Sequence, residues 1–212
     1  MPNVLYLHGF ASSPHSRKAL WFQTRFQELD IGIGVPDLEA GDFQSLTISG
    51  MLNCVKAASG GERVTLMGSS LGGYVAALYA SLWPAEVERL ILMAPAFGFA
   101  RMWLKRIGPE AEEEWKRNGT MRMMHYGMGR EAEIGWTLME DALGFPAEPQ
   151  PVHDSLVFHG LSDDVAPVDA ARHWCEGHES RRLVVYADGH ELSEVLEPMW
   201  DETKAFLGLG DR

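Results

Sequence analysis

The amino-acid sequence predicts an α/β fold built on a mostly parallel, doubly wound sheet. Short apolar runs alternate along the chain with stretches whose apolar residues recur at helical spacing. The runs at 64–67 and 90–93 are apolar at nearly every position, which is typical of strands buried on both faces of a parallel sheet. Helical crossovers must then cover both faces, and this is the doubly wound arrangement.

The elements expected from these patterns follow in chain order. Each strand is an apolar run, and each helix is an amphipathic stretch between two such runs. A chain of 212 residues is long enough for one well-buried core, so we expect a single domain over residues 1–212. The expected strands are 3–7, 33–38, 63–69, 87–94, 155–159 and 182–186, and the expected helices are 16–29, 47–58, 71–82, 168–176 and 193–206.

A tight turn joins the strand at 63–69 to the helix at 71–82. Its sequence, Gly68-Ser69-Ser70-Leu71-Gly72, fits a nucleophile elbow, in which a serine with strained backbone angles leaves a strand and enters a helix. Glycines two positions either side of Ser70 let the chain double back, whereas Ser69 has no glycine two residues before it. Ser70 is therefore the predicted nucleophile, and an ordinary glycine-rich turn is the alternative.

A serine hydroxyl is too weak an acid to attack unaided, so it needs a histidine base oriented by a carboxylate. His190 follows the predicted strand 182–186 through a short turn, and Asp163 and Asp164 follow the strand 155–159. The order serine, acid, histidine occurs in known triads. We predict Asp163, in His-Gly-x-x-Asp spacing, as the acid and Asp164 as a capping residue. A plain turn is the alternative for both aspartates and for His190.

Backbone amides that stabilise a developing oxyanion are expected at two places. One is the amide of Leu71, the residue after the nucleophile. The other is the amide of Phe10, in the loop that follows the first strand, where Gly9 permits close backbone approach. His8 is expected to brace this loop and to take no part in proton transfer.

An inserted segment at about 97–151 interrupts the alternation of strands and helices. Proline and glycine mark its entrance and exit, and it is rich in aromatic residues and methionine. Insertions at this point in a doubly wound sheet lie over the strand ends where ligands bind. We expect a small helical cap that lines the substrate pocket with Phe97, Trp103, Met121 and Met124. The alternative for each of these side chains is ordinary packing of the cap on the core.

Two of these segments resemble a known family. Residues 5–14 (LYLHGFASSP) and 68–74 (GSSLGGY) resemble the small bacterial α/β-hydrolase esterases of the YqiA type, most strongly over the first ninety residues. Residues 159–164 (HGLSDD) are similar to the acyl-glucuronide esterase and palmitoyl-thioesterase group of the same superfamily. The resemblance implies a minimal α/β-hydrolase fold without antiparallel opening strands, and it carries over Ser70, Asp163, His190 and the amides of Phe10 and Leu71. The chain departs from the family in its middle segment and at Ala166.

The composition limits the classes of binding partner that we expect. A net charge of −12, from 18 basic and 30 acidic residues, disfavours nucleic acid and anionic membranes. The acidic cluster within 110–114 is expected to be a solvated helix face. The N-terminus lacks the pattern of a signal peptide, and no apolar run is long enough to span a membrane. Cys54 and Cys175 form no disulfide framework, so we expect small apolar packing roles and a cytoplasmic location.

These observations predict a serine hydrolase, a carboxylesterase that cleaves small to medium acyl esters through an acyl-enzyme on Ser70. The chemistry needs no metal or organic cofactor, and the remaining histidines show no ligand pattern. The expected partner is a small-molecule acyl ester or thioester, and the oligomeric state is left open. The alternatives are an acyl thioesterase or a protein or lipid deacylase, cleavage of amides or aminoacyl esters, and a catalytically idle small-molecule binding module.

Overall fold

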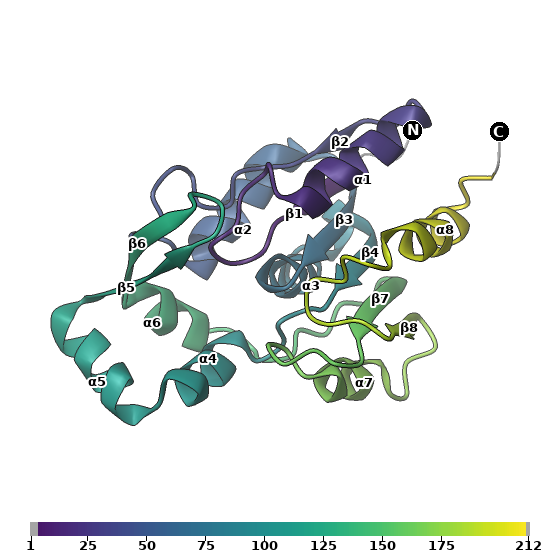
Figure 1. Cartoon of the computed structure of the whole chain (residues 1–212). Coiled ribbons are helices and arrows are strands. Elements are labelled where there is room, and N and C mark those ends of the chain that lie inside the picture. Colours follow the sequence, from purple (N-terminus) through teal and green to yellow (C-terminus); the bar gives the residue numbers. More distant parts are fainter. Residues whose placement is uncertain (1–3, 211–212) are drawn as a thin grey trace.

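The computed structural model describes residues 4–210 and contains a six-stranded sheet at its centre (Figure 1). The strand order is β2-β1-β3-β4-β7-β8, and every neighbouring pair is parallel. This confirms the predicted doubly wound parallel sheet. The strands are β1 (Val4–Leu7), β2 (Ile33–Gly34), β3 (Val64–Ser69), β4 (Val87–Met93), β7 (Ser155–Gly160) and β8 (Arg181–Tyr186).

Helices cover both faces of this sheet and create a separate apolar core on each. On one face, Phe22, Phe26 and Trp200 pack against Tyr6 and Ile91 of the sheet. The other core is formed by buried residues of α2, α3 and α7 against the opposite sides of the same strands. The helices are α1 (Arg17–Glu28), α2 (Ile48–Ser59), α3 (Leu71–Leu82), α7 (Val168–Cys175) and α8 (Leu196–Leu207), with a short 3₁₀ turn, η1 (Pro84–Glu86), before β4.

The predicted elements agree with the structure to within a few residues, except near β2. The expected strand at 33–38 shrinks to Ile33–Gly34. Pro36 has no backbone N–H to donate to a neighbouring strand, and the following residues form a loop that runs to α2. Residue 3 of the expected first strand lies outside the described residues. No helix among residues 4–210 has the length and hydropathy needed to cross a membrane.

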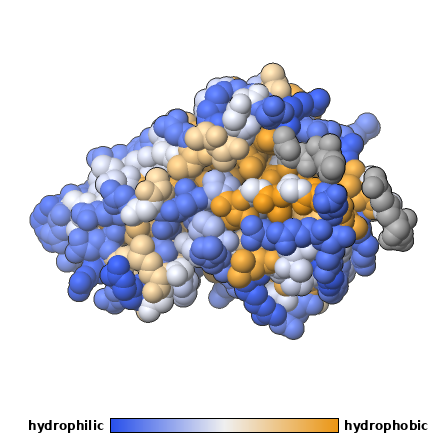
Figure 2. Space-filling model, turned by 90° about the horizontal axis from the view of Figure 1, so that it is seen from above, coloured by the Kyte–Doolittle hydropathy of each residue, from blue (hydrophilic) through white to orange (hydrophobic). Residues whose placement is uncertain are grey.

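The inserted segment lies between β4 and β7 and extends to one side of the sheet (Figure 1). The segment contains the expected helices and also an antiparallel hairpin, which the sequence analysis did not predict. Alternate side chains of the first hairpin strand face the protein, which is strand periodicity. The far end of the cap is hydrophilic, as Figure 2 shows. The elements are α4 (Phe99–Ile107), α5 (Pro109–Asn118), β5 (Thr120–His125), β6 (Arg130–Gly135) and α6 (Thr137–Leu143).

Candidate active site

Ser70 lies in the turn between β3 and α3 and has a backbone conformation that is unusual for a residue with a side chain. Its φ is 54° and its ψ is −117°. The N–H of Ser70 donates to the carbonyl of Met93 at 2.9 Å, and the carbonyl of Ser70 accepts from Ala96 at 3.0 Å. Both partners belong to the end of β4 and the loop after it. The surrounding structure thus holds Ser70 in the strained geometry of a nucleophile elbow.

The glycines that flank Ser70 are required by close backbone contacts. A Cβ on Gly68 would lie 2.3 Å from the carbonyl oxygen of Gly72. A Cβ on Gly72 would lie 2.2 Å from the carbonyl oxygen of Leu7, at the end of β1. Both neighbours are backbone atoms that have no rotamer to change. The two glycines therefore let the elbow close against β1.

We expect Gly72→Ala to lower the free energy of unfolding by about 3 kcal/mol, at the upper end of the usual cost of overpacking a core. Urea denaturation monitored by circular dichroism measures this. Gly32→Ala is the matched control, because a Cβ at Gly32 meets nothing within 4 Å. Equal stability of the two variants would contradict the tight elbow.

The structure brings Ser70, His190 and Asp163 together, although they are far apart in the sequence. The Nε2 atom of His190 lies 2.9 Å from the hydroxyl oxygen of Ser70. The Nδ1 atom of His190 lies 2.8 Å from Oδ2 of Asp163. Because an ionised carboxylate only accepts, Nδ1–H donates to Asp163, and this leaves the lone pair of Nε2 to accept the Ser70 hydroxyl. The geometry is that of a serine with its base and orienting acid.

Asp163 is the buried member of the Asp163-Asp164 pair, and its carboxylate accepts from several donors. Oδ1 accepts from the amides of Val165 and Ala166 at 2.9 and 2.8 Å. Oδ2 faces His190 and also lies 3.2 Å from Nε2 of the fully buried His159. Burial by itself raises the pKa of Asp163, but the hydrogen bonds from His159, His190 and Ala166 outweigh it and hold the pKa well below its ordinary value. Asp163 is thus kept ionised beside His190.

Asp188, two residues before His190, has a different task. Its carboxylate accepts from the amides of Gly189 at 2.7 Å and Glu194 at 3.1 Å, so it braces the loop that carries His190. The same loop packs tightly on the end of β7, where a Cβ on Gly160 would lie 2.3 Å from the carbonyl of Gly189. These contacts fix the position of the imidazole relative to Ser70.

The backbone amides of Phe10 and Leu71 are the two predicted oxyanion donors. Neither N–H donates a hydrogen bond to an acceptor among residues 4–210. Leu71 is the first residue of α3, where backbone N–H groups have no partner within the helix. A Cβ on Gly9 would lie 3.4 Å from Cβ of Ser70, so the loop at residues 8–14 runs beside Ser70. One unpartnered donor is thus in the residue after Ser70, and the other is in the loop beside Ser70.

His8 is the first residue of this loop, and both of its ring nitrogens are hydrogen-bonded. Nδ1–H donates to the carbonyl of Gly9 at 3.0 Å, and Nε2 accepts from the amide of Leu38 at 3.1 Å. Burial lowers the pKa of His8, which favours the neutral ring that this pair of bonds requires. The structure places His8 as a brace between the 8–14 loop and the loop after β2.

Of the four predicted pocket residues, Phe97, Trp103 and Met121 lie in or against one hydrophobic core, and Met124 does not. Phe97 is buried and stacks on Trp174, and Trp103 meets the ring of Phe10 edge to face at 5.2 Å. Met121 is half-buried against the core of the α2, α3 and α7 face. Met124 is 46% exposed on the outer face of β5, because residues three apart on a strand face opposite sides. Met124 is therefore not brought to the site.

Sequence reasoning missed a lysine that contacts Ser69, the residue before the predicted nucleophile. Nζ of the half-buried Lys18, from the first turn of α1, donates to the hydroxyl of Ser69 at 3.1 Å. Burial lowers the pKa of Lys18, and carboxylates at Asp163, Asp188 and Glu191 oppose that shift. A lysine early in an amphipathic helix carries no signal that it turns inward, so the pattern gave no reason to single it out.

A model of an uncharacterised protein family matches residues 3–208 of the chain. The chain belongs to the uncharacterised protein family UPF0227. This match confirms the resemblance to YqiA-type α/β-hydrolases predicted from residues 5–14 and 68–74. Membership of UPF0227 names no reaction.

Solved structures similar to this UPF0227 protein share its fold. A provisionally named hydrolase from Agrobacterium vitis S4 has a TM-score of 0.84 at 22% identity, over 97% of this chain and 87% of that one. Mouse alpha/beta hydrolase domain-containing protein 10 has a TM-score of 0.74 at 16% identity, over 99% and 91%. Est1E from Butyrivibrio proteoclasticus has a TM-score of 0.73 at 18% identity, over 97% and 86%. The UPF0227 protein thus has the α/β-hydrolase fold.

Proposed function

We propose that this UPF0227 protein is a serine hydrolase, a carboxylesterase that acts on small to medium acyl esters. The observation that carries the proposal is the continuous relay from Ser70 through His190 to Asp163, with contacts of 2.9 and 2.8 Å. A binding pocket has no need of a strained serine joined to a base and a buried acid. This arrangement favours an enzyme over the idle binding module.

The proposed reaction has two halves. The Ser70 oxygen attacks the ester carbonyl while its proton moves to Nε2 of His190, and Asp163 stabilises the imidazolium that results. The amides of Phe10 and Leu71 donate to the oxyanion of the tetrahedral intermediate. The C–O bond to the alcohol breaks, and the alcohol leaves with the proton from His190. Water then attacks the acyl-enzyme in the same way, with His190 as the base, and this releases the acid and free Ser70.

Aromatic side chains beside the proposed oxyanion amide favour an apolar acyl group. The ring of Phe10 contacts Phe43, Phe99 and Trp103 at centroid distances of 5.6, 5.5 and 5.2 Å. The indole N–H of Trp103 is buried and has no acceptor among the described residues, so it is free to donate to a polar atom of a substrate. A cavity of about 30 Å³ next to Phe99 is too small for an acyl chain. Ser70, His190 and Phe10 are not among the residues that line it, so this cavity does not define the acyl site.

The names of the structural neighbours support the same class of reaction. They include a monoacylglycerol lipase from Paleococcus ferrophilus and Est1E with ferulic acid bound. Both have identities below 25% to this chain, so they support the proposal only through the shared fold. No metal or organic cofactor takes part in the proposed steps. The small-molecule ester partner and the cytoplasmic location remain predictions.

Hydrolysis of p-nitrophenyl esters from acetate to palmitate, with acyl thioesters run alongside, tests the proposal. We expect the highest kcat/KM on short to medium chains. A preference for palmitate or for thioesters would replace the carboxylesterase with the lipid deacylase or thioesterase alternative. Folded protein that turns over none of these compounds would contradict the proposed function.

A further inference from the structure

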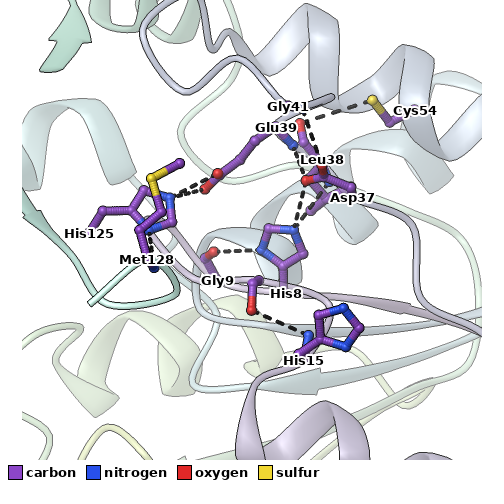
Figure 3. Close-up of polar contacts among 11 residues, drawn as sticks. His8, Gly9, His15, Asp37, Leu38, Glu39, Gly41, Cys54, His125 and Met128 are labelled. Atoms are coloured by element: carbon purple, nitrogen blue, oxygen red, sulfur yellow. Dashed lines mark hydrogen bonds and ion pairs between the residues drawn. The ribbon is translucent and has the colours of Figure 1, made fainter. Parts of the chain in front are cut away.

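The geometry points to His125 and Glu39 as positioning residues that hold the 8–14 loop in place through the cap hairpin. This inference rests on the proposed function, because it concerns the amide of Phe10 in that loop. His125 is the last residue of β5 in the cap, and Glu39 lies in the loop after β2. Figure 3 shows the two side chains facing each other across the junction between cap and core.

The two side chains form a buried hydrogen bond between an imidazole and a carboxylate. Nε2 of His125 lies 3.0 and 2.8 Å from the two carboxylate oxygens of Glu39. The side chains are only 1% and 8% exposed. Burial raises the pKa of Glu39, and the contact with His125 opposes that shift. A buried carboxylate is costly unless it is paired, so this contact ties the cap to the loop after β2.

The second ring nitrogen of His125 fixes the turn of the hairpin. Nδ1 accepts from the amide of Met128 at 3.1 Å, and the same amide also lies 3.2 Å from the carbonyl of His125. Nε2–H can then donate to Glu39 while Nδ1 keeps its lone pair for Met128. One imidazole thus joins the turn at 125–129 to the loop after β2 (Figure 3).

That turn lies directly on the 8–14 loop. The amide of Gly127 donates to the carbonyl of Ala11 at 3.2 Å. A Cβ on Gly127 would lie 2.7 Å from the carbonyl oxygen of Ser12, so the two backbones are in close contact. Ala11 has a φ of 52°, an unfavourable value for alanine, and it directly follows Phe10. The hairpin turn therefore contacts a strained backbone unit that carries the proposed oxyanion donor.

A second route from His125 reaches Phe10 through side chains. The ring of His125 meets Phe43 edge to face at 4.5 Å, and Phe43 contacts Phe10 at 5.6 Å. On the far side of the loop after β2, His8 accepts from the amide of Leu38 (Figure 3). The loop after β2 is thus hydrogen-bonded to His8 through Leu38 and to His125 through Glu39.

An oxyanion donor acts most strongly in the transition state, so displacing it lowers kcat more than it changes KM. Complete removal of one donor typically costs about 10²- to 10³-fold in kcat. We expect a smaller loss, about 10- to 100-fold, when the hairpin no longer holds the 8–14 loop and the Phe10 amide shifts. A purely structural role would instead reduce the amount of folded enzyme and leave the kcat of the folded fraction unchanged.

The experiment measures kcat and KM for p-nitrophenyl acetate together with inhibition by phenylboronic acid, which forms a tetrahedral adduct with an active-site serine. His125→Phe keeps the ring against Phe43 and removes both hydrogen bonds. Gly127→Ala separates the turn from the 8–14 loop and leaves the hydrogen bond between His125 and Glu39 unchanged. Glu39→Gln keeps an oxygen acceptor for Nε2–H, whereas Glu39→Leu does not. Glu131→Gln, on the exposed part of β6, is the matched control.

Active-site titration of the folded fraction normalises every rate. We expect His125→Phe, Gly127→Ala and Glu39→Leu to lose about 10- to 100-fold in kcat, with KM nearly unchanged and weaker inhibition by phenylboronic acid. Glu39→Gln is expected to retain most of kcat. If folded His125→Phe and Gly127→Ala keep the wild-type kcat, the positioning role is overturned and the proposed function is unaffected. A wild type without Ser70-dependent turnover would instead overturn the proposed function.

Discussion

Replacing Ser70 with alanine is expected to lower kcat for p-nitrophenyl acetate by about 10⁶-fold, the scale seen when the nucleophile of a serine hydrolase is removed. The variant lacks the oxygen that faces Nε2 of His190 at 2.9 Å, so the proposed acyl-enzyme cannot form at this position. Fold and substrate binding are expected to persist, because the elbow is held by backbone hydrogen bonds to Met93 and Ala96.

Ser69→Ala is the matched control for this prediction. Ser69 is adjacent in sequence, but its hydroxyl accepts from Lys18 on the side of α1, whereas Nε2 of His190 pairs with the hydroxyl of Ser70. Loss of that bond leaves a half-buried ammonium with one partner fewer, at a cost of about 1–3 kcal/mol in stability. We expect kcat to stay within about tenfold of the wild type, which is about 1.4 kcal/mol in activation free energy. Equal losses in the two variants would contradict the assignment of Ser70.

Asp163→Asn is expected to lower kcat by about 10⁴-fold, as in triads whose acid is replaced by its amide. The change removes the charge that stabilises the His190 imidazolium, and an amide nitrogen placed at the Oδ2 position would donate to Nδ1 and impose the wrong tautomer. The amides of Val165 and Ala166 favour oxygen at the other position, which forces this orientation. Steady-state kinetics at saturating p-nitrophenyl acetate measure the loss.

Asp164→Asn serves as the control, because Asp164 is exposed and adjacent. Its kcat is expected to match the wild type within experimental error. If Asp164→Asn lost as much activity as Asp163→Asn, the acid of the relay would have to be reassigned. A small effect of Asp163→Asn in a folded protein would show that His190 does not depend on this carboxylate.

The sequence predicted the sheet and the central site because both depend on local patterns. Ser70 is flanked by glycines, which are required there because a larger residue would clash with the backbone. Asp163 and His190 each follow an apolar strand run. In a parallel sheet such strand ends meet at one edge, so residues distant in the chain could be grouped without coordinates. The distances that join them to Ser70 come from the structure alone.

What the sequence did not predict depends on contacts between segments that carry no common pattern. His125 and Glu39 lie 86 positions apart, one in the cap and one in an irregular loop, and neither belongs to a motif. The hairpin itself was missed because apolar residues at 121, 123 and 124 fit neither strict alternation nor a helix. Met124 was assigned to the pocket for its residue type, whereas the strand periodicity turns it outward.

The most direct test of the account is covalent labelling with a fluorophosphonate, followed by intact-mass measurement and peptide mapping. The probe reacts with a serine whose hydroxyl is activated by a base, and it does not require the natural substrate. We expect one adduct per chain, located on Ser70, absent in Ser70→Ala and strongly slowed in Asp163→Asn. A folded wild type that takes up no label, or takes it up on another residue, would contradict the conclusion that Ser70 is the nucleophile.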